Sequence, residues 1–313
     1  MGNKQLRLSF APHIRDKSTT TRIMFDVVLA LFPCTAFGVY NFGLSALIII
    51  GVCVLSCVVF EAIWNGLMKK KNTLGDLTAI ITGLVLALNL PPTIPFWIAI
   101  IGSAFAIFIV KMLFGGVGEN ILNPALGAKC FLLLSFAAPM ETFVYNNIPT
   151  ATPAQIINAA GNVDNLQLLF GNTAGCIGET CALAVLLGAI YLFIRRIIDY
   201  RIPLFYLLTV VVFISVYSIF TRGGIDGSYL ISHLLSGGIL FGAFFMATDY
   251  VTCPITNNGK ILYGILIGIL TCVFKIFGNP IGAVAYAIII GNLVSPLFET
   301  MTRRKSFGKG AKL

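Results

Sequence analysis

Charged side chains are scarce in this chain of 313 residues. Asp, Glu, Lys and Arg together make up 11% of the sequence, whereas soluble globular domains contain about 25%. Hydrophobic residues reach 58%, and the mean hydropathy is +0.93. Because such a composition cannot supply a water-facing surface, soluble enzymes and soluble binding modules are excluded. An all-α polytopic membrane protein is predicted, since helices satisfy their own backbone hydrogen bonds in lipid.

Motifs of soluble enzymes are missing as well. The sequence contains no Walker A loop and no dinucleotide fingerprint. None of its eight cysteines forms a Cys-x-x-Cys pair, so most of them are predicted to pack within apolar segments. Cys176 and Cys181 flank the end of a polar segment, and for these two a disulfide or a cluster ligand is an alternative.

Ten apolar segments are predicted to span the membrane, because roughly 20 apolar residues in a helix cross a hydrocarbon core of about 30 Å. The third segment is short and ends at Asn89-Leu90-Pro91-Pro92, where neither proline can donate a hydrogen bond to a continuing helix. The predicted spans cover residues 24–40, 44–68, 77–90, 94–114, 124–139, 181–198, 202–220, 231–248, 261–277 and 281–301.

Lysine and arginine positions orient the predicted bundle. Ten crossings return the C-terminus to the side of the N-terminus, and placing both basic ends in the cytoplasm agrees with the positive-inside rule. Of the 21 lysines and arginines, only Arg222 and Lys275 then fall on the outer side. Residues 140–178 contain no Lys or Arg, so they are predicted to be extracytoplasmic. The net charge of +9 is therefore attributed to topology and not to nucleic-acid binding.

A weak internal repeat divides the chain. Thr82-Gly83 opens an apolar segment that leads past a break to Lys111, and Ser236-Gly237 opens one that leads past a break to Lys275. Five helices in each half would give the halves opposite orientations, as in an inverted repeat with polar sites near the midplane. The predicted parts are a cytoplasmic arm (1–22), a first five-helix repeat (23–139), an extracytoplasmic loop (140–180), a second five-helix repeat (181–301) and a cytoplasmic tail (302–313).

Three carboxylates are candidates for an ion pathway. Asp249, Glu61 and Glu119 lie in or beside apolar segments, where a charged group is costly unless it is used. Asp249 and Glu119 have a simpler explanation as helix caps at the cytoplasmic interface. For Glu61, which lies inside an apolar segment, the alternative is a buried pair with a cation. The sequence leaves the coupling ion, and any bound metal, undetermined.

A glycine-rich segment precedes the sixth predicted span. Gly171, Gly175 and Gly178, followed by Glu179, lead into a helix, where free backbone N–H groups can bind a phosphate group. The alternative is a simple turn in which Glu179 or Thr180 caps the helix.

Three longer patterns carry a family resemblance. They are Gly-Gly-x-Gly-x-Asn-x-x-Asn-Pro-Ala at 115–125, Gly-Asn-Thr-x-Gly-x-Ile-Gly-Glu-Thr at 171–180 and Phe-Gly-Ala-Phe-Phe-Met-Ala-Thr-Asp at 241–249. Over residues 22–296 the chain resembles the D subunits of Rnf complexes and, more distantly, the B subunits of Na⁺-translocating NADH:quinone reductases. The short N-terminal arm favours the Rnf family.

The resemblance implies a subunit of a complex that moves electrons between reduced ferredoxin and NAD⁺ and exports Na⁺ or H⁺. It also implies a bacterial or archaeal cell (inner) membrane, the other Rnf subunits (A, B, C, E and G) as partners, and a flavin-attaching transferase. D subunits of this family carry FMN joined through its phosphate to a threonine in a Ser-x-Ala-Thr type of motif. Thr152 is the matching acceptor, and Pro149 stands where the family has serine.

The resemblance extends to further cofactor contacts and leaves other functions open. The residues predicted to contact a cofactor besides Thr152 are Gly171, Gly175, Gly178, Glu179, Asn120 and Asn123. Whether a second, noncovalent flavin such as riboflavin lies between the helices is not decided by the sequence. Two alternatives without a redox role are a secondary transporter with inverted repeats and a structural anchor for other subunits.

Overall fold

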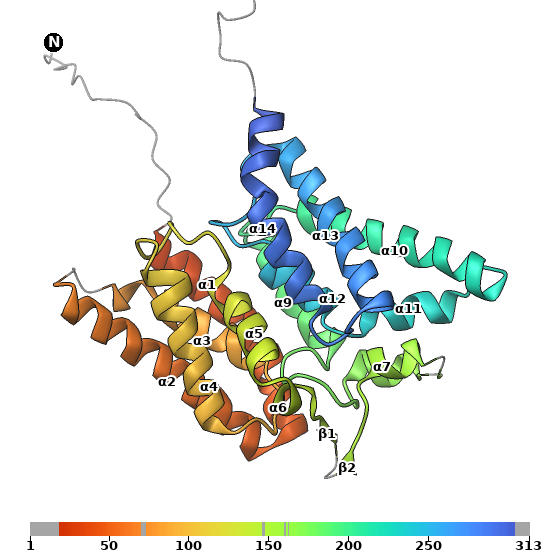
Figure 1. Cartoon of the computed structure of the whole chain (residues 1–313), viewed down its shortest axis with the longest axis horizontal. Coiled ribbons are helices and arrows are strands. Elements are labelled where there is room, and N and C mark those ends of the chain that lie inside the picture. Colours follow the sequence, from red (N-terminus) through yellow and green to blue (C-terminus); the bar gives the residue numbers. More distant parts are fainter. Residues whose placement is uncertain (1–18, 70–72, 146–147, 160, 162, 304–313) are drawn as a thin grey trace, which may run out of the picture.

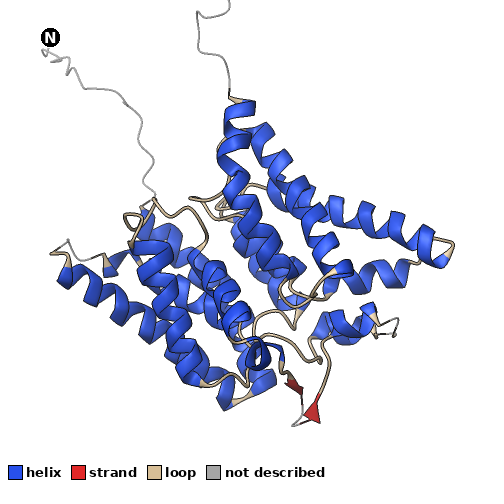
Figure 2. Cartoon of the chain, in the orientation of Figure 1, coloured by secondary structure: helices blue, strands red, loops and turns tan. Residues whose placement is uncertain are grey.

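The computed structural model describes residues 19–69, 73–145, 148–159, 161 and 163–303. Helices dominate this part of the chain (Figure 2), and the strands described are one short antiparallel pair, β1 (Val144–Tyr145) and β2 (Ile148–Pro149). The predicted all-α membrane architecture is confirmed. Most of the predicted arm (1–22) and tail (302–313) lies outside the described residues, as do Lys70 and Lys71, which the topology prediction also used.

Within the described residues, five helices are long and apolar enough to cross a membrane alone. They are α1 (Thr20–Phe42), α2 (Leu44–Leu67), α10 (Arg201–Arg222), α13 (Asn257–Phe277) and α14 (Ala283–Thr302). A sixth candidate consists of α11 (Gly227–Leu235) followed by α12 (Ile239–Phe241) and η3 (Gly242–Met246), with a bend of 59° at the break. Gly237 and Gly238 both have positive φ in this break, a conformation that glycine adopts without steric cost.

Shorter apolar helices complete the bundle. They are α3 (Thr78–Leu88), α4 (Phe96–Ala104) continuing into the π-helical η2 (Phe105–Met112), α5 (Pro124–Ser135) and α9 (Ala182–Ile194). Helix is therefore present in each of the ten predicted segments. The 11 residues of α3 extend only about 16 Å, so this helix reaches about halfway through a hydrocarbon core.

The segment before α9 meets α3 where that helix ends. The N–H of Gly178 donates to the carbonyl oxygen of Leu88 over 2.8 Å, and the N–H of Ile177 donates to that of Leu90 over 3.1 Å. These bonds satisfy carbonyl groups that the proline pair leaves without helical partners. The predicted third span is thus a half-helix that continues into a turn paired with the loop that precedes α9.

Small helices and the strand pair gather at one end of the molecule. Besides β1 and β2, these are α6 (Ala137–Glu141), α7 (Pro153–Asn158) and α8 (Asn165–Phe170), while η1 (Leu74–Asp76) follows α2. Figure 1 shows β1, β2 and α7 at the end opposite to the one where both chain termini leave the bundle. The start of α1 and the end of α14 therefore lie at one end of the described helices, and β1, β2 and α7 lie at the other; which end faces the cytoplasm stays a prediction.

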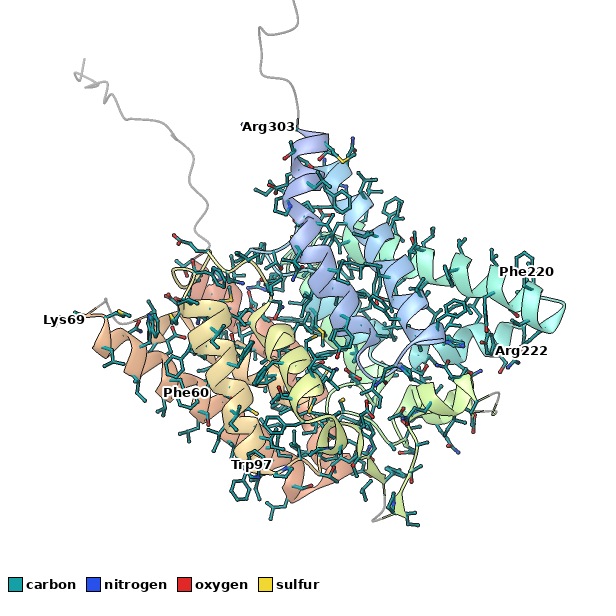
Figure 3. All side chains as sticks on the ribbon, viewed as in Figure 1. Phe60, Lys69, Trp97, Phe220, Arg222 and Arg303 are labelled. Atoms are coloured by element: carbon teal, nitrogen blue, oxygen red, sulfur yellow. The ribbon has the colours of Figure 1, made fainter. Side chains whose placement is uncertain are left out.

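The distribution of side chains is that of a protein in lipid. Large apolar side chains such as Phe220 and Trp97 are exposed on the outside of the helices (Figure 3). Polar and charged side chains are buried inside instead, among them Glu61, Lys111 and Lys129. Ionisable groups at membrane depth are costly unless they are paired, so these buried groups indicate where functional or structural polar clusters lie.

Glycines allow close helix contacts in the core. At Gly83 in α3, an added Cβ would lie 2.7 Å from the Cα of Val54 in α2. At Gly188 in α9, an added Cβ would overlap the carbonyl oxygen of Ala30 in α1. Small residues at such positions let helix backbones approach closely, which is how helices associate in membranes. The α1–α9 contact joins the two predicted halves.

Candidate functional site

Thr152 lies beside a small cavity at the end of the bundle that carries β1, β2 and α7. The cavity has a volume of about 30 Å³. It is lined by Phe143, Thr152, Pro153, Ala154, Leu168, Thr173, Ala174, Gly175, Cys176, Glu179, Thr180, Leu235, Ser236, Gly237, Pro280 and Ile281. Thus the polar loop, the glycine-rich segment and the break after α11 meet around the predicted acceptor. We call this space the Thr152 cavity.

Thr152 is the N-cap of α7. Its hydroxyl accepts a hydrogen bond from the N–H of Gln155, and the Gln155 side chain accepts one from the N–H of Thr152 over 2.9 Å. The backbone of Thr152 is extended, as expected before Pro153. The side chain of Thr152 is buried, although Thr152 lies in the loop that was predicted to be extracytoplasmic. The side chain of the nearby Thr150 is exposed. Thr-x-x-Gln is a capping-box pattern, so the sequence did contain the signal for this short helix.

Only part of the glycine-rich segment reaches the Thr152 cavity. Gly175 and Glu179 line it, and their contact with a cofactor stays a prediction. Gly178 does not, and its N–H is used by the carbonyl of Leu88, so it is not free to bind a phosphate group. Gly171 ends α8 with positive φ and packs against Phe37, away from the cavity.

Glu179 is held in a buried ion pair. The Lys129 Nζ of α5 donates to Glu179 Oε1 and to Asn89 Oδ1, each over 2.9 Å. The topology prediction placed Lys129 at the cytoplasmic face, but its side chain is buried in the bundle beside the end of α3. The helix that follows is capped by Cys181, whose Sγ accepts from the N–H of Ala184, and neither Glu179 nor Thr180 is the cap.

The cysteines do not form a metal centre or a disulfide in the structure. All eight are free, and Cys253 alone among them is not fully buried. Cys176 lines the Thr152 cavity, and Cys181 caps α9. No group of three or more His, Cys, Asp or Glu side chains suited to a metal ion is found among the described residues. The disulfide and cluster-ligand alternatives for Cys176 and Cys181 therefore have no support in this geometry.

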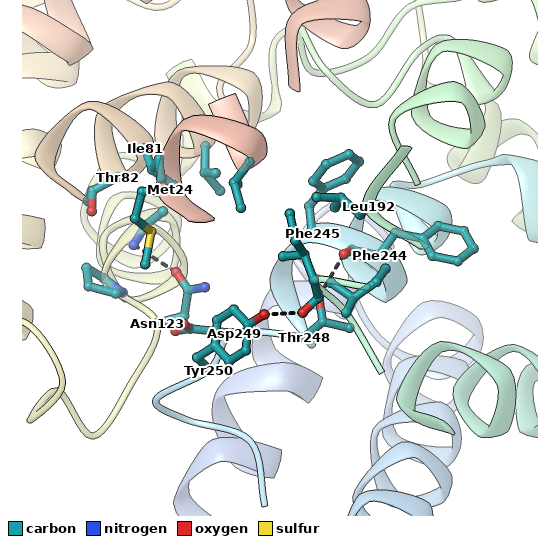
Figure 4. Close-up of a pocket in the computed structure, with 16 residues that line it drawn as sticks. Met24, Ile81, Thr82, Asn123, Leu192, Phe244, Phe245, Thr248, Asp249 and Tyr250 are labelled. Carbon is teal, nitrogen blue, oxygen red and sulfur yellow. Dashed lines mark hydrogen bonds between the residues drawn. The ribbon is translucent and has the colours of Figure 1, made fainter. Parts of the chain in front are cut away.

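A second cavity of about 120 Å³ lies between the two halves, near the start of α1 (Figure 4). Met24, Ile81, Thr82 and Asn123 lie on one side of it, and Leu192, Phe244, Phe245 and Thr248 lie on the other. Val27, Val85, Pro124, Ala125, Ile197, Ile198, Asp249 and Tyr250 complete its lining. We call it the inter-half cavity. Because α1 begins here and β1 and β2 lie at the opposite end of the bundle, it is remote from Thr152.

Asp249 and Asn123 are the predicted site residues in the inter-half cavity. Asn123 caps α5, accepting at Oδ1 from the N–H groups of Ala125 and Leu126. Asp249 is in the turn after η3 and has no cation partner within 4.0 Å among the described residues. Burial raises the pKa of Asp249, while hydrogen bonds from Val251, Thr252 and Tyr250 lower it by less. Asn120 bonds to the carbonyl of Leu122 and does not line the cavity.

The other two candidate carboxylates lie elsewhere. Glu61 is fully buried and accepts from Lys111 Nζ over 2.6 Å and from the Thr73 hydroxyl over 2.5 Å. Lys111 also donates to the Thr78 hydroxyl over 2.8 Å, so it is buried rather than placed at the inner face. Glu119 is exposed in the turn before α5. The three predicted ion-pathway carboxylates are therefore not assembled into one site.

Comparison with known proteins agrees with this architecture. The sequence pattern of the NQR2, RnfD, RnfE family matches residues 7–308. The chain is 41% identical to the D subunit of the Na⁺-translocating ferredoxin:NAD⁺ oxidoreductase complex of Acetobacterium woodii, over 98% of this chain and 97% of that protein. It is 35% identical to the D subunit of the proton-translocating ferredoxin:NAD⁺ oxidoreductase complex of Clostridium ljungdahlii, over 96% of each chain.

A third relative is archaeal. The D subunit of the ion-translocating oxidoreductase complex of Methanosarcina acetivorans is 37% identical over 95% of each chain. All three similarities extend over nearly the whole of both proteins, so they include both halves of the bundle and the segment that carries Thr152. The chain belongs to the NQR2, RnfD, RnfE family, and within it to the D subunits of ion-translocating oxidoreductase complexes.

Proposed function

We propose that this chain carries FMN attached through its phosphate to the Thr152 hydroxyl and relays electrons within an ion-translocating ferredoxin:NAD⁺ oxidoreductase complex. The observation that carries the proposal is the position of Thr152. Thr152 lines a cavity built from the polar loop, the glycine-rich segment and the break after α11. An FMN group supplies one-electron chemistry, and the protein supplies its position and potential.

The residues around Thr152 suit a phosphoryl group. The Thr180 hydroxyl is buried, faces the Thr152 cavity and has no hydrogen-bond partner, so a donor is left for an added oxygen. Thr173 and Ser236 also line the cavity. A volume of about 30 Å³ is far below the roughly 300–1,000 Å³ of pockets that enclose drug-sized ligands. The flavin ring therefore belongs at the cavity mouth, where a partner subunit can reach it.

The capping box prepares the acceptor hydroxyl. Gln155 Oε1 lies 3.1 Å from Thr152 Oγ1 and accepts a hydrogen bond from its hydroxyl, while Thr152 Oγ1 accepts one from the N–H of Gln155, so the capping box fixes the orientation of the hydroxyl. Thr150 instead donates to the carbonyl of Ile148 and is exposed. Pro149, at the place where the family has serine, is part of β2. The attaching transferase would therefore recognise Thr152 without a hydroxyl at position 149.

Ion coupling is assigned to the inter-half cavity. Asp249 offers a carboxylate without a fixed cation partner, whereas Glu61 is already neutralised by Lys111. Coupling requires that the affinity for the ion differ between redox states, because a ligand shifts an equilibrium only through differential affinity. The relatives named above include one Na⁺-translocating and one proton-translocating complex, so Na⁺ and H⁺ are both proposed as the exported ion.

A second, noncovalent flavin such as riboflavin would also be assigned to the inter-half cavity, beside Phe244, Phe245 and Asn123. At about 120 Å³ the cavity is too small to enclose one in this conformation, so binding would require the halves to separate. The proposed setting is a bacterial or archaeal inner membrane, with both termini in the cytoplasm and residues 140–178 outside. The proposed partners are the A, B, C, E and G subunits of the Rnf complex.

Covalent attachment is tested by ultraviolet fluorescence of the denatured protein on a gel. The full chain is produced with its flavin-attaching transferase, together with Thr152→Val and the matched control Thr150→Val. We expect fluorescence in the wild type and in Thr150→Val, and none in Thr152→Val. A wild-type chain without fluorescence would favour the alternatives of a secondary transporter or a structural anchor.

A further inference from the structure

Lys275 is a buried cation directly behind the wall of the Thr152 cavity. Its side chain is 2% exposed in the last turn of α13. The ammonium donates to the carbonyl oxygen of His233 over 2.7 Å, and to the carbonyl oxygen and the hydroxyl of Ser236 over 3.0 Å each. Ser236 and the next residue, Gly237, both line the cavity. The ammonium thus contacts a residue that lines the Thr152 cavity.

Gly237 leaves the charge unshielded. A Cβ placed on Gly237 would lie 3.5 Å from Lys275 Nζ and 3.4 Å from the Cβ of Ala154 in α7. Gly237 therefore places no side chain of its own between the ammonium and the first turn of the helix that Thr152 caps. Asn158 of α7 also donates to the Lys275 carbonyl over 2.5 Å, which fixes α7 against the end of α13.

The charges around the cavity do not cancel. Glu179 is paired with Lys129 at 2.9 Å, so these two neutralise each other. Among the described residues, no carboxylate oxygen lies within 4.0 Å of Lys275 Nζ, whose partners are carbonyl and hydroxyl oxygens. When Lys275 is protonated, one positive charge without a carboxylate partner therefore lies behind the wall. In a buried environment with an effective dielectric constant well below that of water, such a charge acts over several ångströms.

We propose that Lys275 is a positioning residue for the redox group on Thr152. The positive charge of Lys275 offsets the negative charge of the phosphoryl group and raises the reduction potential of the attached flavin. The inference rests on the proposed attachment of FMN. Reduction adds negative charge to the flavin, and a fixed positive charge nearby stabilises the reduced form more than the oxidised form. Lys275 does this without contacting the flavin, because its three hydrogen bonds are used to hold the break after α11.

The test is a redox titration of the flavin absorbance in the purified full chain, produced with its flavin-attaching transferase. Lys275→Met is expected to keep covalent fluorescence on a denaturing gel and to shift the midpoint potential to more negative values. Lys275→Arg keeps the charge and is expected to stay close to the wild type. Lys260→Met is the control, since Lys260 is in the first turn of the same helix, roughly 22 Å away, and pairs with Asp199.

A second variant covers the case in which Lys275→Met does not fold. Lys275→Gln also removes the charge but keeps a donor for the carbonyl oxygens that the ammonium holds, so its midpoint potential is expected to become more negative as well. A fluorescent Lys275→Met chain with a wild-type potential would overturn the proposal, and so would a fluorescent Lys275→Gln chain with a wild-type potential. Absence of covalent flavin in the wild type would instead refute the proposed attachment, and it is detected before any potential is measured.

Discussion

Lys129 and Glu179 form a buried ion pair that joins α5 of the first half to the segment that leads into α9 of the second. The ammonium and carboxylate are 2.9 Å apart, and Asn89 at the end of α3 shares the ammonium. Two groups separated by 50 residues in the sequence thus meet at the end of α3, beside the loop that leads into α9. Because the carboxylate also lines the Thr152 cavity, the pair connects the helix core with the candidate cofactor site.

Breaking this pair is expected to destabilise the protein strongly. Lys129→Met leaves Glu179 buried without its cation, and the loss of one partner of a buried pair costs about 3–5 kcal/mol. Thermal unfolding of the detergent-solubilised chain measures the effect. The double variant Lys129→Met with Glu179→Gln removes both charges and should recover much of the loss. A single variant as stable as the wild type would show that the pair is solvated rather than buried.

A second prediction concerns the contact between the halves. Gly188→Ala would drive a methyl group into the backbone carbonyl of Ala30, which cannot move without displacing α1. Overpacking of this kind costs about 1–3 kcal/mol. Gly51→Ala in α2 is the matched control, since an added Cβ there meets nothing within 4 Å, and alanine in place of a glycine inside a helix should leave stability unchanged or raise it by up to about 1 kcal/mol. Equal melting temperatures for the two variants would contradict the close α1–α9 contact.

The sequence predicted the helical segments well because hydropathy is a local property. The short third span was visible in the proline pair that follows Asn89 and Leu90, and α3 ends at Leu88, just before these residues. Its role as a half-helix was not visible, because the partner loop at Gly178 is far along the chain. The capping box at Thr152 is local and was available in the sequence as Thr-x-x-Gln.

Buried charges were the main failure of prediction from sequence. Lys111 and Lys129 lie near the ends of apolar segments, and charge counting placed them at the cytoplasmic face. The structure buries both, since each finds a carboxylate 50 residues away, Glu61 and Glu179 respectively. A lysine that snorkels to an interface and a lysine that pairs within the bundle look alike in a sequence. Only the fold tells which carboxylate comes near.

The capping box allows a third prediction. Gln155→Ala removes the side chain that accepts from the N–H and hydroxyl of Thr152, so the start of α7 should loosen. Helix caps contribute about 0.5–2 kcal/mol, and the loss should be confined to this short helix. Hydrogen exchange of the amides in α7 measures it, and Asn158→Ala at the other end of α7 serves for comparison. If exchange at Ile156 and Ile157 is unchanged in Gln155→Ala, the reciprocal cap is not formed in the membrane protein.

The last prediction separates the three candidate ion-pathway carboxylates. Asp249→Asn keeps the shape of the side chain in the inter-half cavity but removes its charge, so we expect Na⁺-dependent or H⁺-dependent transport by the complex to fall while covalent flavin stays at the wild-type level. Glu119→Gln should leave transport unchanged, because Glu119 is exposed and outside this cavity. Glu61→Gln should lower thermal stability, because it leaves the buried Lys111 ammonium without a carboxylate partner.

Transport is measured in vesicles that contain the whole complex, with flavin fluorescence recorded for each variant so that a loss of cofactor is not mistaken for a loss of coupling. Wild-type transport in Asp249→Asn would remove this residue from the pathway. A selective loss in Glu119→Gln would move the ion site from the inter-half cavity to the exposed turn before α5. The assignment to Asp249 therefore depends on a difference between two carboxylates that the sequence alone treated alike.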